Sequence, residues 1–107
     1  MRIISRRTLR EFVDQLAGHK DQRAVKAALD AWYAEAIRAE WRSTADIKKR
    51  YATASIVSAE RVVFNIKGND YRLIVAVDFE KSIVWIKWVG THRAYDEIDA
   101  KEVKHGE

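Results

Sequence analysis

The fold of this chain is decided by residues 61–96, which read RVVFNIKGNDYRLIVAVDFEKSIVWIKWVGTHRAYD. Three runs rich in β-branched and aromatic residues are separated by two short polar breaks, Gly68-Asn69 and Glu80-Lys81. Gly and Asn tolerate positive φ and are common in two-residue hairpin loops. The stretch therefore predicts three consecutive antiparallel strands, followed by a polar segment, Thr91–Asp96.

The two breaks also predict which residues lie opposite each other. A loop at Gly68-Asn69 pairs Asn65 with Arg72 and Phe64 with Leu73, because a hairpin loop fixes the register of its strands. A loop at Glu80-Lys81 fixes the second hairpin in the same way. Its pairs are Val77 with Val84, Val75 with Ile86, Leu73 with Trp88, and Arg72 with Val89.

Side chains alternate between the two faces of a strand, so this register predicts two unlike faces. One face is almost wholly apolar: Val62, Phe64, Ile66, Tyr71, Leu73, Val75, Val77, Phe79, Val84, Ile86 and Trp88. The other mixes polar and apolar side chains: Arg61, Asn65, Lys67, Arg72 and Lys87 with Val63, Ile74, Ala76, Trp85 and Val89. The apolar face needs a cover, and the cationic face is then free to meet a ligand.

The rest of the chain supplies that cover. Residues 1–5 predict a short strand, and apolar residues at helical spacing predict one helix from about residue 6 to Gly18 and a second over residues 21–40. Ser43 or Thr44 can cap a short helical turn through Lys49. We expect a loop over residues 51–58 and a final short helix over residues 97–104. The order predicts a single α+β domain over residues 1–107, with a two-helix hairpin on one face of a mostly antiparallel sheet.

Composition narrows the function. The 107-residue chain has no cysteine and no apolar run near the ~20 residues that a membrane span needs, so we expect a cytoplasmic protein. Its formal charge is +4, and its cations cluster. One cluster holds Arg2, Arg6, Arg7 and Arg10, and another is Lys48-Lys49-Arg50. This distribution favours an anionic partner, most simply nucleic acid.

One group of residues could carry chemistry. Arg72 lies opposite Asn65 on the predicted polar face, Lys87 lies on the next strand, and His92 and Tyr95 follow it. Arg and Lys stabilise a phosphodiester transition state, His transfers protons near neutral pH, and Tyr can stack on a base. A metal-independent ribonuclease, with the RNA 2′-hydroxyl as nucleophile, uses these parts. We expect no metal and no cofactor, because the three histidines are scattered and no glycine-rich loop opens a helix.

Each of these residues also has a purely structural interpretation. Arg72 could pair with Asp78 or Asp96, His92 could follow a helix cap at Thr91, and Tyr95 could bury its ring beneath a final helix. Asn65 and Asn69 could serve the turn alone. A module that binds RNA or the ribosome without cutting, or one that binds an acidic protein segment, is therefore an alternative function.

The residues resemble a known family, the HigB toxins of type II toxin–antitoxin systems. The resemblance rests on two joined motifs, Phe64-Asn65-x-x-Gly68-Asn69-x-Tyr71-Arg72-Leu73 and Thr91-His92-x-x-Tyr95-Asp96. Trp41 and Asp46-Ile47-Lys48 add to it, and it covers residues 41–99.

The resemblance implies a RelE-like fold and a ribosome-dependent endoribonuclease that cuts mRNA during translation. It also implies contact with ribosomal RNA and neutralisation by a helix-turn-helix antitoxin similar to HigA. Carried over by position, Asn65, Arg72, His92 and Tyr95 match the family's polar signature, with Lys67 and Lys87 as neighbours. On this basis we expect Arg72, His92, Lys87 and Tyr95 to be the catalytic residues. The implied substrate-binding residues are Asn65, Lys67 and Asn69.

Overall fold

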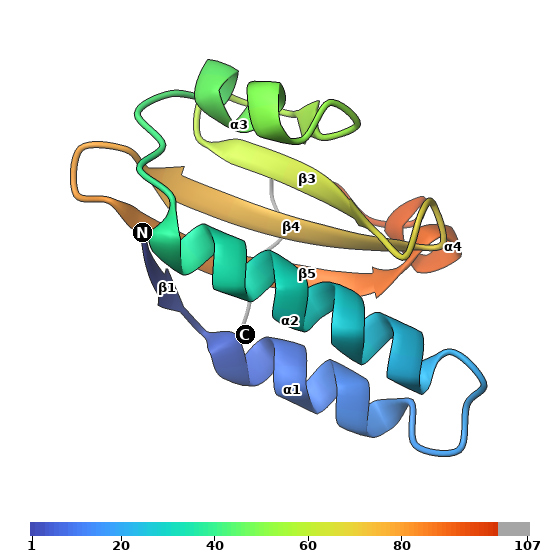
Figure 1. Ribbon diagram of the computed structural model, residues 1–107. Coiled ribbons are helices and arrows are strands. Elements are labelled where there is room, and N and C mark those ends of the chain that lie inside the picture. Colours follow the sequence, from blue (N-terminus) through green and yellow to red (C-terminus); the bar gives the residue numbers. More distant parts are fainter. Residues whose placement is uncertain (101–107) are drawn as a thin grey trace.

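The computed structural model describes residues 1–100 as a sheet with helices on one face (Figure 1). The predicted α+β architecture is confirmed. The elements in chain order are β1 (Arg2–Ile4), α1 (Arg6–Gln15), α2 (Gln22–Arg38), α3 (Thr44–Arg50), β2 (Ser55–Ile56), β3 (Arg61–Ile66), β4 (Tyr71–Asp78), β5 (Ile83–Thr91) and α4 (His92–Tyr95).

The sheet has the strand order β1-β5-β4-β3-β2. Strands β2 to β5 are antiparallel to their neighbours, whereas β1 pairs parallel with β5, through Arg2 with Ile83 and Ile4 with Trp85. The first hairpin has the predicted register, since Asn65 pairs with Arg72 and Phe64 with Leu73. The sheet is mostly antiparallel, as the sequence predicts.

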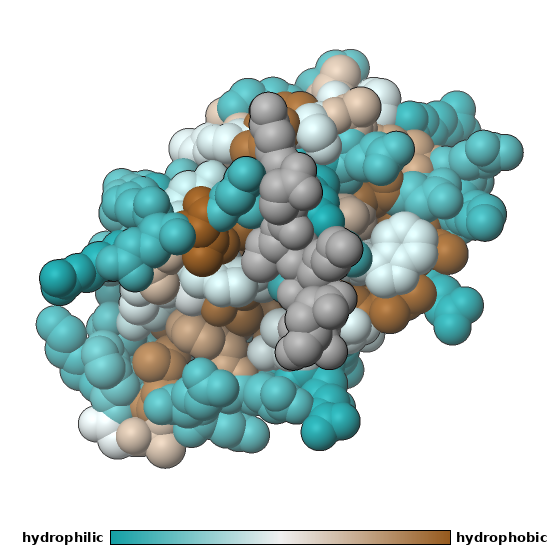
Figure 2. Space-filling view, turned by 180° about the vertical axis from the view of Figure 1, so that it is seen from behind, coloured by the Kyte–Doolittle hydropathy of each residue, from teal (hydrophilic) through white to brown (hydrophobic). Residues whose placement is uncertain are grey.

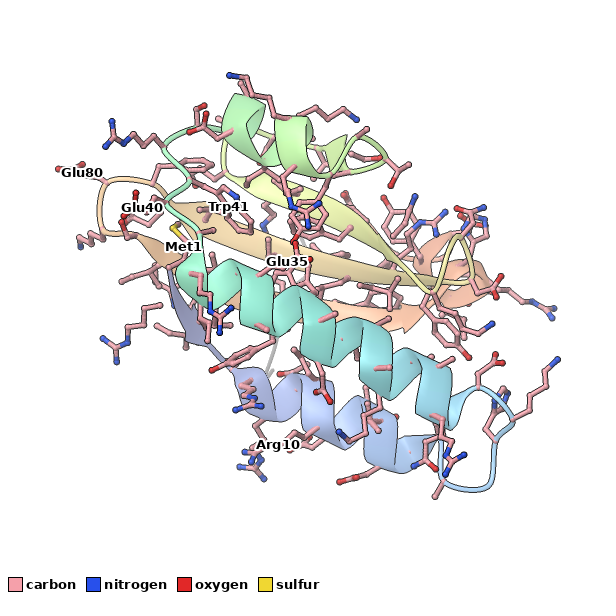
Figure 3. All side chains as sticks on the ribbon, viewed as in Figure 1. Met1, Arg10, Glu35, Glu40, Trp41 and Glu80 are labelled. Carbon is pink, nitrogen blue, oxygen red and sulfur yellow. The ribbon has the colours of Figure 1, made fainter. Side chains whose placement is uncertain are left out.

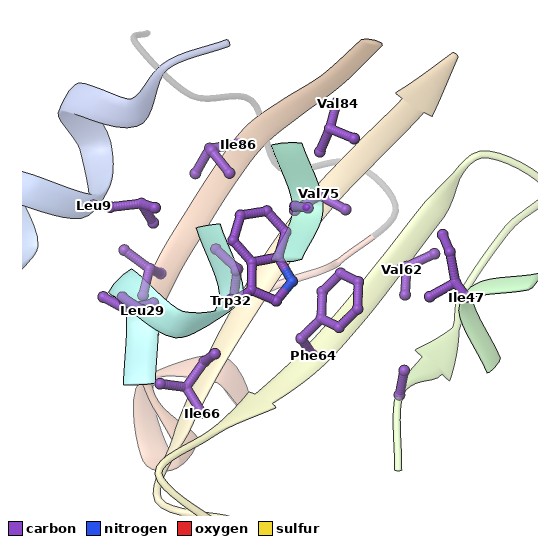
Figure 4. Close-up of a cluster of buried hydrophobic side chains, with 14 of the residues drawn as sticks. Leu9, Leu29, Trp32, Ile47, Val62, Phe64, Ile66, Val75, Val84 and Ile86 are labelled. Atoms are coloured by element: carbon purple, nitrogen blue, oxygen red, sulfur yellow. The ribbon is translucent and has the colours of Figure 1, made fainter. Parts of the chain in front are cut away.

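Helices α1 and α2 lie side by side across one face of this sheet (Figure 1). The core fills the space between them and the strands (Figure 4). At its centre the Phe64 ring lies 5.4 Å from Trp32 of α2 and 5.0 Å from Tyr51, both edge-on. Helix α3 closes the β3 side with Ile47, which is fully buried. The helical hairpin therefore covers the predicted apolar face.

Local chemistry accounts for the helix boundaries. The Ser43 hydroxyl accepts a hydrogen bond from the Asp46 amide at 3.4 Å, so Ser43 is the cap of α3. Helix α1 ends at Gln15, earlier than predicted, and Gly18 takes φ 81° in the turn before α2. Such a turn favours glycine, which has no Cβ to clash.

The turn between β3 and β4 differs from the prediction. Positive φ falls on Lys67 (51°) and Gly68 (64°) rather than on Gly68 and Asn69. Asn69 does not have a positive φ, and its side chain accepts a hydrogen bond from Arg72. The strand register is unaffected, because Ile66 still pairs with Tyr71 across the turn.

The second hairpin contains a β-bulge that the sequence analysis missed. Val75 pairs with Ile86 as predicted, but Ile74 then pairs with Trp88, which leaves Lys87 as an extra residue. Beyond the bulge the predicted faces of β5 are exchanged. Trp88 packs with the cluster on the far side of the sheet, and Val89 joins the core beneath the helices.

Two smaller expectations also change. Residues 51–58 are not all loop, because Ser55 and Ile56 form the edge strand β2 against β3. The C-terminal helix is present but begins at His92, directly after β5, and ends at Tyr95. Residues 97–100 are not helical, and the remainder of the predicted helix, residues 101–104, lies outside the described residues.

Candidate functional site

The candidate site lies on the sheet face that α1 and α2 leave uncovered, where β4, β5 and α4 meet. Figure 2 shows the molecule from behind, where polar side chains surround paler and apolar ones. Arg72 points to this face from β4, opposite Asn65 on one side and Gly90 on the other. Only 9% of its surface is exposed, which is unusual for an arginine.

Asn69 fixes the guanidinium of Arg72 from the preceding turn. Nη1 donates to the Asn69 backbone oxygen at 2.9 Å, and Nη2 donates to the Asn69 side-chain Oδ1 at 2.7 Å. Nη1 also lies 3.3 Å from the backbone oxygen of Tyr71. These acceptors are neutral, so they orient the charge of Arg72 without cancelling it. Within residues 1–100, neither Asp78 nor Asp96 pairs with Arg72.

The ring of Tyr95 lies next to Arg72. The guanidinium carbon is 5.8 Å from the ring centroid, within the range of a cation–π contact. Tyr95 in turn lies 6.3 Å from the Trp88 ring, and both pack against a small apolar cluster. The buried members of that cluster are Val63, Ile74 and Ala100. Tyr95 is half-buried, and its ring has Arg72 and Trp88 as neighbours.

His92 is positioned by the start of α4. The Thr91 hydroxyl accepts from the Ala94 amide at 3.0 Å and caps the helix, and the His92 amide donates to the Asp70 backbone oxygen at 2.9 Å. The second contact ties α4 to the turn that carries Asn69. The His92 Nε2 lies 3.5 Å from Asp96 Oδ2, whereas Nδ1 is buried and has no hydrogen-bond partner within residues 1–100.

Lys67 lies apart from this cluster. Its Nζ lies 3.0 Å from Asp70 Oδ2 and 3.6 Å from Asp21 Oδ1, at the start of α2. The hydrogen bond to Asp70 raises the pKa of Lys67 above its usual value. The Tyr71 hydroxyl donates to Asp21 at 2.9 Å and lowers the pKa of that carboxyl. Lys67 thus belongs to a network at the helix side of the turn.

Asn65 and Lys87 are not members of the cluster around Arg72. The Asn65 amide nitrogen lies 3.5 Å from the Thr53 backbone oxygen, a long contact directed away from Arg72. Lys87 is the extra residue of the β5 bulge and is half-buried. The cluster proper is therefore formed by Asn69, Arg72, His92 and Tyr95.

Two members of the site were placed wrongly or overlooked by the sequence analysis. Trp88, predicted under the helices, supports Tyr95 instead. Asp96, considered only as a partner for Arg72, lies beside His92. The i, i+4 spacing of His92 and Asp96 was the available signal, but it applies only once α4 begins at His92.

The arrangement can bind and polarise an anion. The guanidinium of Arg72 is fixed beside the Tyr95 ring at one end of the open face, and the His92 imidazole belongs to the same short helix as that ring. Across residues 1–100, no group of His, Cys, Asp and Glu side chains comes together that could hold a metal ion. The same residues contain no helix long and apolar enough to cross a membrane.

The fold and the site define a small α+β domain with a cationic, aromatic cluster opposite its helices. The chain belongs to the HigB toxin family, described as the RelE-like toxic component of a toxin–antitoxin system, which matches residues 25–98. A comparison with curated proteins gave no match. The family confirms the resemblance and the RelE-like fold, gives the chain the role of a toxin, and implies an antitoxin as its partner.

Proposed function

We propose that this toxin is an endoribonuclease that cuts translated mRNA on the ribosome without a metal ion. The observation that supports this most directly is the arrangement of Arg72. Its guanidinium is nearly buried, is oriented by Asn69 through uncharged acceptors, and lies against Tyr95. Among the described residues its acceptors are all neutral, and a preorganised cation of this kind suits the extra negative charge of a phosphoryl transition state.

The reaction uses the RNA itself as nucleophile. The 2′-oxygen forms a bond to the adjacent phosphorus, and the bond from phosphorus to the 5′-oxygen breaks. A base removes the 2′-hydroxyl proton, and an acid gives a proton to the departing 5′-oxygen. The products are a 2′,3′-cyclic phosphate and a 5′-hydroxyl end. One proton is taken from the RNA and one is returned to it, so the net charge of the RNA does not change.

Five residues of the site and its surroundings have roles in this reaction. Arg72 stabilises the charge on the non-bridging phosphate oxygens, and Lys87 adds electrostatic stabilisation from β5. Tyr95 stacks on or orients the nucleotide. His92 transfers a proton, and the nitrogen that does so is Nε2, because Nδ1 is buried. Asp96, 3.5 Å from Nε2, stabilises the imidazolium.

The partners follow from the toxin role. The substrate is mRNA held on the ribosome, and the exposed cations of α1 contact ribosomal RNA. These cations are Arg6, Arg7 and Arg10. We propose that the antitoxin is a helix-turn-helix protein similar to HigA, and that residues 1–107 form one toxin domain that acts in the cytoplasm.

The test compares induced expression of the wild type with the variants Arg72→Ala and His92→Ala. Primer extension on a translated mRNA should show cuts inside codons for the wild type only. Arg93→Ala is the matched control, because Arg93 is exposed and lies on the same helix as His92. The new RNA ends should carry a 5′-hydroxyl and a 2′,3′-cyclic phosphate, the products of attack by the 2′-oxygen.

The alternative is a toxin that binds the ribosome without cutting RNA. In that case the wild type arrests growth but primer extension shows no new RNA ends, and Arg72→Ala weakens ribosome binding. New RNA ends that carry a 5′-phosphate would contradict the proposed mechanism, because attack by the 2′-oxygen leaves a 5′-hydroxyl. Cleavage that persists in both variants would place the site elsewhere.

A further inference from the structure

A second feature lies on the helical side of the molecule, between α2 and α3. A hollow of about 440 Å³ opens where the end of α2, the connection after it and the end of α3 meet. It is lined by Ala34, Glu35, Arg38, Trp41, Arg50 and Tyr51, among others. Figure 3 shows Glu35 on α2 and Glu40 and Trp41 on the connection around it.

This hollow continues into a second one along α2. The second has a volume of about 160 Å³ and shares Glu35 and Tyr51 with the first. Its other walls include Ala28, Ala31 and Trp32 of α2. We call the two hollows together the α2–α3 groove. It runs along α2 from Ala28 to Arg38 and on to Glu40 in the connection, which is long enough for a peptide segment.

The wall and floor of the groove suit close contact with another chain. Ala31 and Ala34 are exposed and bring only a methyl group, so a partner backbone can approach α2 closely. The floor is aromatic, with the rings of Trp41 and Tyr51 6.2 Å apart. Ile37, on a neighbouring part of α2, is 44% exposed and adds apolar surface beside it. Aromatic pockets of this kind hold the anchor residues of protein interfaces.

A polar group in the groove lacks a partner. Trp32 lines the smaller hollow and is only 4% exposed, yet its indole Nε1 has no acceptor among the described residues. Leaving a buried N–H without an acceptor costs about 1–3 kcal/mol. Because Nε1 itself has almost no exposed surface, a partner would have to displace neighbouring side chains to bring an oxygen to it, and that hydrogen bond would remove the cost.

The charges around the groove favour an acidic segment over RNA. Arg38, Arg42 and Lys49 are exposed, and no acidic side chain of residues 1–100 forms an ion pair with them. Inside the groove, Glu35 accepts from the Tyr51 hydroxyl at 2.6 Å and pairs with Arg50 at 2.9 Å. The carboxylates of Glu35 and Glu40 repel any anion placed inside the groove, while the cations at its rim attract anions that flank it. This pattern suits a segment with a neutral centre and acidic flanks better than RNA, which carries a phosphate at every nucleotide.

We propose that the α2–α3 groove is the docking surface for the antitoxin, which contributes a segment with an apolar anchor and acidic flanking residues. The anchor lies against Trp41 and Tyr51, the acidic residues pair with Arg38, Arg42 and Lys49, and an oxygen accepts from Trp32 Nε1. The inference rests on the antitoxin partner that the family implies and not on RNA cleavage, so either can fail without the other.

The first test changes the wall of the groove. Ala31→Arg and Ala34→Arg place a long charged side chain in it, and Ala24→Arg is the matched control, because Ala24 is exposed on α2 but does not line the groove. The probe is the antitoxin that co-purifies with the full chain, separated and titrated back by calorimetry. We expect affinity to fall about 100-fold for the groove variants and less than about twofold for the control.

The second test uses the unsubstituted toxin in its complex with the antitoxin. The four tryptophans give four indole N–H signals in an NMR spectrum of the ¹⁵N-labelled toxin. The Trp32 signal is assigned from its loss in Trp32→Phe. On binding the antitoxin it should shift downfield and exchange more slowly, whereas the Trp85 signal, from β5, should stay in place.

Two results would overturn the proposal. One is unchanged antitoxin affinity in both groove variants together with an unmoved Trp32 signal. The other is unchanged antitoxin affinity with loss of ribosome binding in the groove variants, which would assign the groove to RNA.

Discussion

Asn69 supplies the two closest acceptors of the Arg72 guanidinium, its backbone oxygen to Nη1 at 2.9 Å and its Oδ1 to Nη2 at 2.7 Å. Asn69 lies in the turn between β3 and β4, and Arg72 is on β4 directly after it. The hairpin that sets the register of the sheet therefore also sets the direction of the guanidinium. Asn69 is therefore a positioning residue for Arg72 rather than a group that must touch the RNA.

The first prediction concerns Asn69→Ala. This change removes Oδ1 but leaves the backbone acceptor, so Arg72 loses one of its two orienting contacts to Asn69. A hydrogen bond to a charged group contributes about 1.5–3 kcal/mol, and we expect the cleavage rate to fall about 10- to 100-fold. The rate is measured in a translation mixture with a defined mRNA.

Lys67→Gln is the control for this experiment. Lys67 lies in the same turn but pairs with Asp21 and Asp70. We expect its cleavage rate to stay within about twofold of the wild type. If both variants lost activity equally, the turn as a whole, and not the Asn69 contacts, would be responsible.

The second prediction concerns Gly90, which lies opposite Arg72 on β5. A Cβ at this position would lie 2.5 Å from Cη2 and Cζ2 of Trp88, so Gly90→Ala must displace the indole. Because Trp88 supports Tyr95, we expect a loss of about 1–3 kcal/mol in the free energy of unfolding and a lower cleavage rate. Urea unfolding and the cleavage assay measure the two effects.

A double-mutant cycle with Trp88→Leu checks the cause. Leucine lacks the ring atoms that the added methyl group would meet, so the extra cost of Gly90→Ala should shrink in that background. An equal cost in both backgrounds would mean that the glycine is needed for its backbone and not for the space it leaves.

The sequence predicted the first hairpin correctly but only half of the second. The Gly-Asn turn defines one register for β3 and β4, and the alternation of apolar residues agrees with it. In β5 the apolar residues at 84, 86 and 88 continue the same alternation, so nothing in their pattern indicates a bulge at Lys87. Gly90 was the available signal, since a glycine inside a strand often marks a bulge or a close approach.

The third prediction concerns pH. The Tyr71 hydroxyl lowers the pKa of Asp21 below its usual value of 3.8. A carboxyl with a lowered folded-state pKa stabilises the fold above its unfolded pKa, and this contribution is lost as pH falls through the folded value. Tyr71→Phe should therefore destabilise the protein at neutral pH, and the difference from the wild type should shrink below about pH 4.

Unfolding in urea at about pH 7 and about pH 3 measures this difference. Tyr33→Phe is the control, because the Tyr33 ring lies under Arg6, 4.1 Å from its guanidinium carbon, and does not contact Asp21. Its effect should be the same at both pH values. A pH-independent effect of Tyr71→Phe would show that packing, and not the hydrogen bond to Asp21, explains the loss.

The fourth prediction concerns the core. Phe64 contacts three other rings, those of Trp32, Trp41 and Tyr51. Phe64→Ala should reduce the free energy of unfolding by about 3–5 kcal/mol, whereas Phe64→Leu should reduce it far less, because a leucine refills most of the space. Urea unfolding of both variants measures this. A small loss for Phe64→Ala would mean that the surrounding rings collapse into the cavity.

For the candidate site, the sequence indicated the residue types better than their contacts. Of the predicted site residues, the structure places the Tyr95 ring beside Arg72, and His92 on the same short helix as Tyr95. The direction of Lys67 could not be predicted, because it depends on a positive φ at Lys67 itself and on the position of Asp21 at the start of another helix. Long-range contacts of this kind carry no local pattern.

The parallel pairing of β1 with β5 has a consequence for synthesis. Arg2 and Ile83 lie far apart in the chain, yet they are neighbours in the sheet. Before β5 has emerged from the ribosome, β1 lacks the strand with which it pairs. Trp88, Gly90 and the whole of α4 are missing at that stage as well. The site around Arg72 therefore forms only after β5 and α4 have both emerged from the ribosome, later than the helical hairpin and the first β-hairpin.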